Sequence, residues 1–145
     1  MQLTRSILLT SLVLAAGVAQ AEPVTSASAV QAKLKAAGYT QVHELERDDG
    51  LWEADVTRPD GRFAEVRVDP ATGEIFDARD GRPVLDSAAI LTHAQRHGLK
   101  DIHKLKRDGA LWEVEARDAA GRPVKARLSG IDGRLVHSER ERWWD

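Results

Sequence analysis

The sequence predicts an α+β protein made of two tandem repeats, each a helix packed on a three- or four-stranded antiparallel meander sheet. Residues 38–76 match residues 98–136 at a fixed offset, with 12 identities in 39 positions and no gap. A repeat this regular indicates one supersecondary unit used twice. Each copy begins with helical periodicity and continues with period-two alternation interrupted by turn residues. The identical pairs include Gly38/Gly98, His43/His103, Leu45/Leu105, Trp52/Trp112, Arg67/Arg127 and Gly73/Gly133.

The helix of each copy is short and has one apolar face. The expected faces are Ala27, Val30, Leu34 and Ala37 in the first copy, and Ile90, Leu91 and Ala94 in the second. Ser26 or Ser28, and Asp86 or Ser87, are the candidate N-caps. Gly38 and Gly98 stand where a helix C-terminal glycine belongs. Because such short helices are unstable alone, each must cover a sheet.

The strands are predicted from alternation and from the turns between them. Trp52 and Trp112 are in phase with Ala and Val residues, which predicts that both lie in the core beneath the helix. Val42 and Leu45 are three residues apart, which breaks the alternation and predicts a bulge. In the turn 69–73, Asp69 is expected to cap and Gly73 to adopt a positive φ.

The first 21 residues have the pattern of a cleaved signal peptide. Arg5 precedes an apolar run too short to span a bilayer comfortably, and Ala19-Gln20-Ala21 is a small-x-small cleavage site. The expected organisation is a signal peptide at 1–21, repeats at 22–80 and 85–145, and a linker at 81–84. We therefore expect a periplasmic or secreted bacterial protein, without membrane insertion after cleavage. The chain has no cysteine, so burial rather than disulfides must stabilise it.

The first copy resembles the PepSY domain. A helix ending in Gly-Tyr, a strand with Leu-Trp-Glu-Ala, and above all Val-Asp-Pro-Ala-Thr-Gly-Glu-Ile at 68–75 carry the resemblance, which covers nearly all of 25–79. In the second copy Ser-Gly-Ile-Asp-Gly at 129–133 replaces the turn, and the match is weaker. The resemblance implies extracytoplasmic, non-catalytic modules, found in propeptides of secreted metallopeptidases and in free-standing bacterial proteins. It also implies a peptidase-inhibiting role, which has been proposed for the family.

The residues give little support for catalysis. There is no Cys nucleophile and no Gly-x-Ser-x-Gly elbow, so we expect no enzyme and no cofactor. His93 and His97, four apart on the second helix, are weak candidates for a metal site. Ala94 stands where a metalloprotease helix would carry its general base, and metal binding needs more than two protein ligands.

Two features single out candidate partner-binding residues. Residues 25–80 hold 7 basic and 12 acidic residues, a net charge of −5, whereas residues 85–140 hold 11 and 8, a net charge of +3. Equivalent positions reverse their charge, as in Glu44/Lys104, Glu46/Lys106, Glu65/Lys125 and Glu74/Arg134. Two alternatives stay open besides drift: the unlike charges draw the copies together, or they face a partner. Trp143 and Trp144, outside the repeat, either dock on the body or form an exposed anchor.

These observations predict an exported binding or regulatory module that recognises a protein or peptide partner in the cell envelope, a peptidase among the candidates. The partner-binding candidates are Glu46, Glu65, Lys106, Lys125, Trp143 and Trp144. Recognition through a strand face or strand edge is the expected mode. The alternative is a periplasmic protein that binds a small ligand or a metal. The mixed sign of the positive half does not indicate a nucleic-acid site.

Overall fold

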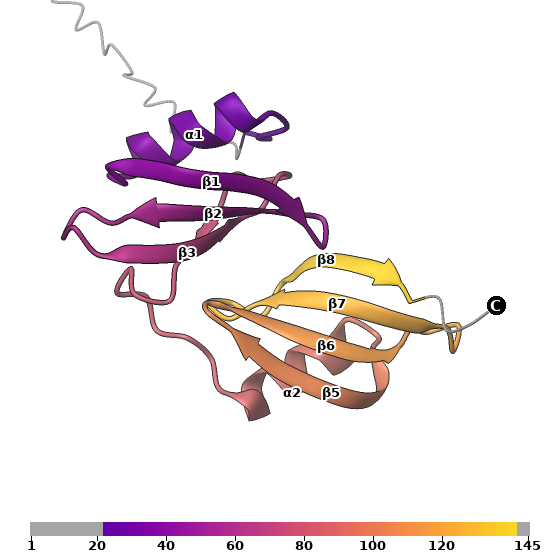
Figure 1. The fold of residues 1–145 in the computed structure, drawn as a ribbon. Coiled ribbons are helices and arrows are strands. Elements are labelled where there is room, and N and C mark those ends of the chain that lie inside the picture. The colour runs from indigo at the N-terminus through magenta and orange to yellow at the C-terminus, as the bar shows by residue number, and fades with distance from the viewer. Residues whose placement is uncertain (1–21, 142–145) are drawn as a thin grey trace, which may run out of the picture.

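The computed structural model describes residues 22–141, and this part of the chain forms two helix-and-sheet units in sequence (Figure 1). The first unit contains α1 (Ala27–Ala36), β1 (Gln41–Asp48), β2 (Leu51–Thr57), β3 (Phe63–Val68) and β4 (Ile75–Phe76). The second contains α2 (Ser87–Arg96), β5 (Lys100–Asp108), β6 (Leu111–Arg117), β7 (Pro123–Ser129) and β8 (Leu135–Arg140). Each sheet is an antiparallel meander, ordered β1-β2-β3-β4 and β5-β6-β7-β8. The predicted α+β class with two tandem units is confirmed.

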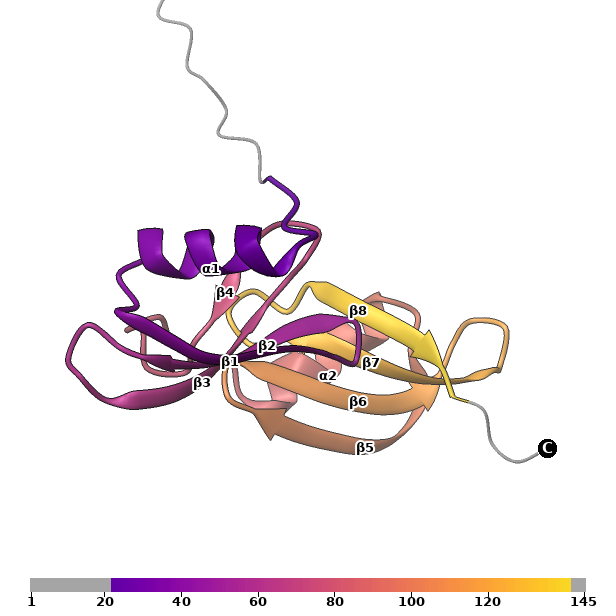
Figure 2. The same ribbon diagram turned by 45° about the horizontal axis from the view of Figure 1, so that its top comes forward.

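Each helix lies along one face of its sheet (Figure 2). Ser26 and Asp86 are the N-caps, and their side chains accept hydrogen bonds from the amides of Ala29 and Ala89. The apolar faces are narrower than predicted. Val30 and Leu34 are buried in α1, and Ile90 and Ala94 in α2, whereas Ala27, Ala37 and Leu91 are exposed. A ten-residue helix on a sheet buries one central stripe, and Leu91 is about 100° around the axis from Ile90.

The two tryptophans occupy equivalent core positions, as their phase predicts. Trp52 is 9% exposed and Trp112 is 8% exposed. The Nε1 of Trp52 donates to the carbonyl of Val24 at 3.0 Å, and that of Trp112 donates to the carbonyl of Leu85 at 3.1 Å. Each indole therefore packs in the core and also fixes the segment that leads into its helix.

The predicted turn and bulge are both present. Gly73 has a φ of +70°, and Asp69 accepts hydrogen bonds from the amide of Ala71 and the hydroxyl of Thr72, both at 2.9 Å. Ser129 takes the place of Asp69 in the second copy, and its hydroxyl accepts hydrogen bonds from the amides of Ile131 and Asp132 in the same turn. The register of β1 against β2 shifts between Val42 and Glu44, where the break in alternation predicts a bulge.

The two units pack on each other through a small apolar cluster that sequence reasoning did not identify. It contains two equivalent pairs, Leu51 with Leu111 and Phe76 with half-buried Val136, together with Ala110, Val84 and Ile131 of the second part of the chain. In an isologous contact, residue i of one copy meets residue j of the other and the reverse also holds. The two equivalent pairs give the cluster part of the reciprocity of such a contact.

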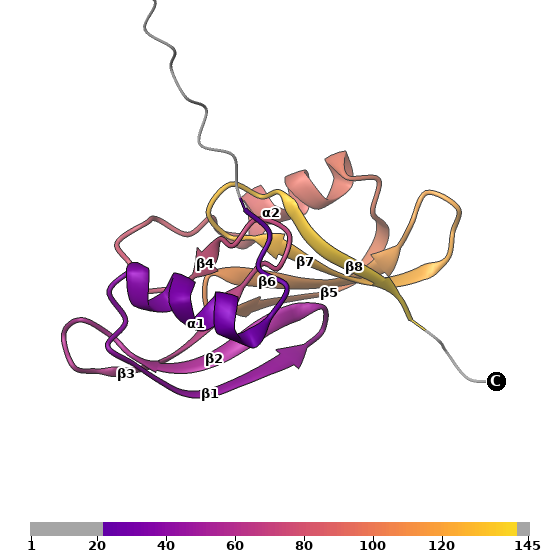
Figure 3. The ribbon, with the colours of Figure 1, turned by 90° about the horizontal axis from the view of Figure 1, so that it is seen from above.

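The ends of the β1–β2 and β5–β6 hairpins also contact the other copy in a reciprocal way. The tip of the β1–β2 hairpin lies beside β8 (Figures 1 and 3), and a Cβ on Gly50 would stand 2.3 Å from the ring of His137. Arg127 reaches Asp49 in this tip at 2.7 Å, while Arg67 of the first copy reaches Asp108 in the β5–β6 tip at 3.5 Å. Each hairpin end thus meets an arginine from the other sheet.

Candidate binding surface on the first sheet

The face of the first sheet that α1 does not cover carries five carboxylates on three adjacent strands. Because side chains alternate along a strand, residues paired across the ladder share a face. Asp55 stands between Glu44 and Glu65, and Glu46 stands opposite Glu53. We call these five residues the acidic face. The face places like charges directly opposite one another, an arrangement that destabilises a sheet.

One cation lies among these carboxylates. Arg67 of β3 contacts Glu53 at 2.6 Å and Glu65 at 2.8 Å, while its Nη2 reaches Asp108 of the second copy. Glu44, Glu46 and Glu65 are exposed. The acidic face therefore has a net negative charge that the first copy does not balance.

The same positions in the second sheet form pairs of opposite charge. Glu115 stands between Lys104 and Lys125, and Lys106 stands opposite Glu113. The ammonium of Lys104 contacts Glu115 at 2.6 Å and Glu113 at 2.7 Å. At these positions the two sheets share one register and differ in charge, because the carboxylates of the second sheet are paired with lysines of the same sheet.

The pKa values of the equivalent residues Glu53 and Glu113 shift in opposite directions. Burial raises the pKa of Glu53, and the nearby Glu65, Asp48 and Glu46 add to the rise against the opposing effect of Arg67. Burial also acts to raise the pKa of Glu113, but Lys104 and the other cations around it outweigh burial and lower the value. Glu53 therefore lies where burial, and the neighbouring carboxylates after it, disfavour its charged form.

An exposed aromatic ring adjoins the acidic face. Phe63 is paired with Thr57 at the outer end of β3 and is 74% exposed, the highest value among the exposed large apolar side chains of residues 22–141. Its ring lies 4.8 Å from that of His43, and His43 Nε2 is 2.8 Å from the hydroxyl of Thr57. The second copy has Pro123 in place of Phe63. Charge and an apolar contact are therefore available together on the first sheet.

The predicted partner-binding residues fall into three groups. Glu46 and Glu65 belong to the acidic face. Lys125 is engaged within the molecule, where its ammonium contacts Asp49 at 2.6 Å, and Lys106 is exposed on β5. Trp143 and Trp144 lie outside the described residues. The structure thus brings Glu46 and Glu65 to one surface and places the two lysines on the other sheet.

The two candidate metal-binding histidines pack against one turn of their own copy. The ring of His93 occupies the space that a Cβ on Gly133 would need, and His97 Nε2 is 3.0 Å from the carbonyl of Gly133. Within residues 22–141, no group of three or more His, Cys, Asp or Glu side chains is placed to hold a metal ion. These contacts give the histidines a packing role at the turn.

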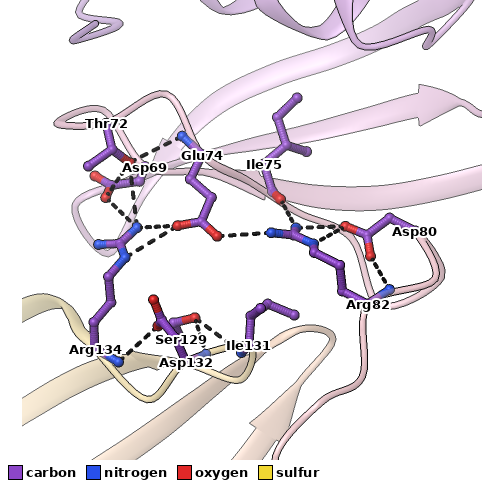
Figure 4. A network of polar contacts seen from close by, with 10 residues as sticks. All are labelled: Asp69, Thr72, Glu74, Ile75, Asp80, Arg82, Ser129, Ile131, Asp132 and Arg134. Atoms are coloured by element: carbon purple, nitrogen blue, oxygen red, sulfur yellow. Dashed lines mark hydrogen bonds and ion pairs between the residues drawn. The ribbon is translucent and has the colours of Figure 1, made fainter. Parts of the chain in front are cut away.

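The charge-reversed pair Glu74 and Arg134 forms a direct contact between the copies (Figure 4). Arg134 donates to Glu74 at 2.6 Å and to the buried carboxylate of Asp69 at 3.0 Å. Arg82 from the linker donates to the other oxygen of Glu74 at 3.0 Å, and its guanidinium also reaches the carbonyl of Ile75. The turn that carries the family resemblance is therefore one of the places where the two copies are in contact. For this pair, attraction between the copies explains the reversal of charge.

The first copy contains a buried polar cluster that was not predicted from the sequence. Asp77 is 2% exposed, accepts from the hydroxyl of Tyr39 at 2.8 Å, and forms an ion pair with Arg58. Burial acts to raise the pKa of Asp77, but hydrogen bonds from Arg58, Arg79 and Tyr39 outweigh it and lower the value. The second copy has Leu99 in place of Tyr39 and keeps no member of the trio, so a repeat alignment gives no signal for the cluster.

A family model described as peptidase propeptide and YPEB domain matches residues 5–79, and the chain belongs to this PepSY family. Among solved structures, the chain is similar to the YpmB protein from Bacillus subtilis, with 21% identity and a TM-score of 0.37. That match covers 79% of this chain and 97% of the other. No curated protein matches. Domains of this family act as propeptide or regulatory modules and typically occur in exported proteins.

No helix within residues 22–141 is long and apolar enough to cross a bilayer.

Proposed function

We propose that the protein is an exported, non-enzymatic binding module that uses the acidic face to bind a cationic segment of a protein in the cell envelope. The observation that carries the proposal is the contrast between the two ladders. Glu44, Asp55 and Glu65 repel one another, whereas Lys104, Glu115 and Lys125 attract. A bound cationic segment would remove that repulsion, and Phe63 offers an apolar contact beside it.

The family supports a regulatory role and one class of partner. Its description joins peptidase propeptides with YPEB domains, so an envelope peptidase with a basic surface segment is one partner that fits. The signal-peptide pattern of the sequence at 1–21 supports export, and these residues lie outside the described part of the chain. In this role the protein contributes a surface and no reacting group.

The proposal is tested by measuring the affinity of a lysine-rich peptide for two variants of the protein that have the same net charge. In the first, Glu44, Glu46 and Glu65 are changed to Gln, which leaves half-buried Glu53 and its ion pair with Arg67 in place. We expect affinity to fall by about tenfold or more, because three charge contacts of roughly 0.5 kcal/mol each are removed. Binding should also weaken steeply with salt.

The matched control removes three exposed carboxylates from other surfaces: Asp60→Asn, Asp101→Asn and Glu139→Gln. Its affinity should stay within about twofold of the wild-type value, since only the long-range field changes. Equal losses in the two variants would show that net charge, and not the acidic face, governs binding. Absence of binding to the wild-type protein at low salt would overturn the proposal outright.

A further inference from the structure

The strand β1 lies at an edge of the first sheet, with β2 as its neighbour in the sheet order. An edge strand presents backbone amides and carbonyls that another extended chain can pair with. Its position next to the acidic face raises the question of how a bound segment is oriented.

The β1–β2 turn fixes which backbone groups of β1 point outward. Asp49 and Gly50 have φ values of 45° and 78°, which define a two-residue type I′ hairpin. In such a hairpin the flanking residues, Asp48 and Leu51, exchange both hydrogen bonds, and the pattern alternates from there. Leu45 and Arg47 therefore direct their N–H and C=O groups away from β2, toward the open edge. The guanidinium of Arg47 lies 5.0 Å from the ring of Trp52, on the helix side of the sheet.

A groove runs beside the start of this strand. It has a volume of about 410 Å³ between α1 and β1, and its lining residues are Gln31, Lys35, Thr40, Gln41, Val42 and His43. An added strand at this edge would have one set of alternate side chains on the helix side, near this groove and half-buried Leu45. The other set would lie on the acidic face, opposite Glu44 and Glu46.

The second sheet has the reverse charges at its equivalent edge. Lys104 and Lys106 occupy β5, where Lys104 is already paired with carboxylates of β6. Lysines on an edge strand discourage pairing with other chains. The charge at the edge of β1 therefore complements an incoming strand with basic residues at every second position.

From these features we infer that the cationic partner binds as an extended strand added antiparallel to β1, with alternate Lys or Arg side chains opposite Glu44 and Glu46. This inference rests on the proposed function and adds a backbone geometry to it. Residues of the partner opposite Leu45 and Arg47 exchange backbone hydrogen bonds with β1. Residues opposite Glu44 and Glu46 form the closer, non-hydrogen-bonded pairs, in which the ammonium groups meet the carboxylates.

The test uses an eight-residue peptide in which lysine and valine alternate, and two N-methylated analogues of the same charge. Methylation of the valine amides removes the donors that face β1, whereas methylation of the lysine amides removes donors that point away. We expect the valine-methylated peptide to bind at least about tenfold more weakly, since it loses several hydrogen bonds. The lysine-methylated peptide should bind within about twofold of the parent.

A second test changes the backbone of β1 in the protein instead of the backbone of the peptide. Arg47→Pro removes an outward N–H without taking a hydrogen bond from β2, because proline is tolerated at such edge positions. Arg47→Ala is its control, since it loses the same side chain and keeps the N–H. Binding of the parent peptide should fall in the proline variant and persist in the alanine variant, with folding of both checked by circular dichroism.

The outcomes separate the inference from the proposed function. If both methylated peptides bind like the parent and the glutamine variant of the acidic face does not bind, the face binds cations without strand addition, and the inference is overturned. If no lysine-containing peptide binds the wild-type protein, the proposed function also fails. If sedimentation shows a dimer that Arg47→Pro dissociates, the edge belongs to a second copy of this chain, which likewise overturns the inference.

Discussion

Replacing Arg134 with Ala should weaken the attachment of the second copy to the first. The guanidinium contacts Glu74 at 2.6 and 3.2 Å, contacts Asp69 at 3.0 Å, and lies 5.6 Å from the ring of Phe76. Hydrogen bonds to charged groups contribute about 1.5–3 kcal/mol. The side chain of Arg134 is 29% exposed, and Asp69 keeps its turn hydrogen bonds, so we expect a loss of about 2 kcal/mol.

For a folded part of this size, a loss of about 2 kcal/mol corresponds to a fall in Tm of roughly 8 °C. The measurement is urea unfolding followed by tryptophan fluorescence, with calorimetry as a second probe of the transition. Arg122→Ala is the matched control, because Arg122 pairs with Asp118 at 2.7 Å while 53% exposed. Its cost should stay below about 0.5 kcal/mol.

A double-mutant cycle with Glu74→Ala then isolates the contact between the copies. The two substitutions should couple by about 1 kcal/mol, since both remove the same ion pair. Additive effects, or a cost for Arg134→Ala no larger than that for Arg122→Ala, would refute the reasoning that this network holds the repeats together.

Three further predictions concern the core, the turn and acid stability. Trp52→Ala and Trp112→Ala should each cost about 3–5 kcal/mol in urea unfolding, and an unchanged Tm in both would mean that the indoles are not core residues. Gly73→Val should destabilise more than Gly73→Asn, because Asn tolerates a positive φ; equal Tm values would argue against that geometry. The lowered pKa of Asp77 means that its stabilisation is present above a pH of about 3.8 and lost as pH falls below it. The fall in Tm from pH 5 to pH 2 should therefore be shallower in Asp77→Asn, and an identical slope would exclude this carboxylate as a cause.

Much of each repeat could be predicted from local signals. The period-two phase placed Trp52 and Trp112 in equivalent cores, and the spacing of Val42 and Leu45 located the bulge. The sequence predicted too many buried residues on each helix, because periodicity alone does not show how far a short helix tilts or where its sheet ends. Leu91 follows the apolar pattern of α2 and is still 38% exposed.

The contacts between the copies could not be predicted in the same way. Leu51 and Leu111 lie beside hairpin turns, where an apolar residue is an ordinary part of a strand. Their sequence context therefore gives no signal that the two side chains share a cluster. The charge reversals did indicate that something distinguishes the copies. Glu74 and Arg134 form a contact between the copies, whereas Glu44, Glu46 and Glu65 of the acidic face are exposed, and for these we propose the second alternative, a partner.

The acidic face is recognisable as unusual because the second copy of the repeat shows a different charge pattern at the equivalent positions. Sequence alone marked Glu46 and Glu65, but the register was needed to place Asp55 between two carboxylates and Glu115 between two lysines. Asp55→Asn should therefore stabilise the protein by a few tenths of a kcal/mol, and Glu115→Gln should destabilise it by a similar amount. Shifts of the same sign in urea unfolding would contradict the contrast between the ladders.

Chemical-shift mapping of the bound lysine-rich peptide tests the central claim most directly. With the labelled wild-type protein, addition of peptide should move the amide signals of Glu44, Glu46, Asp55 and Glu65 and the ring signals of Phe63. The side-chain carboxyl signal of Glu53 should report a lower pKa in the complex, because a cationic ligand stabilises its charged form. Shifts confined to the second sheet, or an unchanged pKa of Glu53 at peptide saturation, would contradict the assignment of the acidic face as the binding surface.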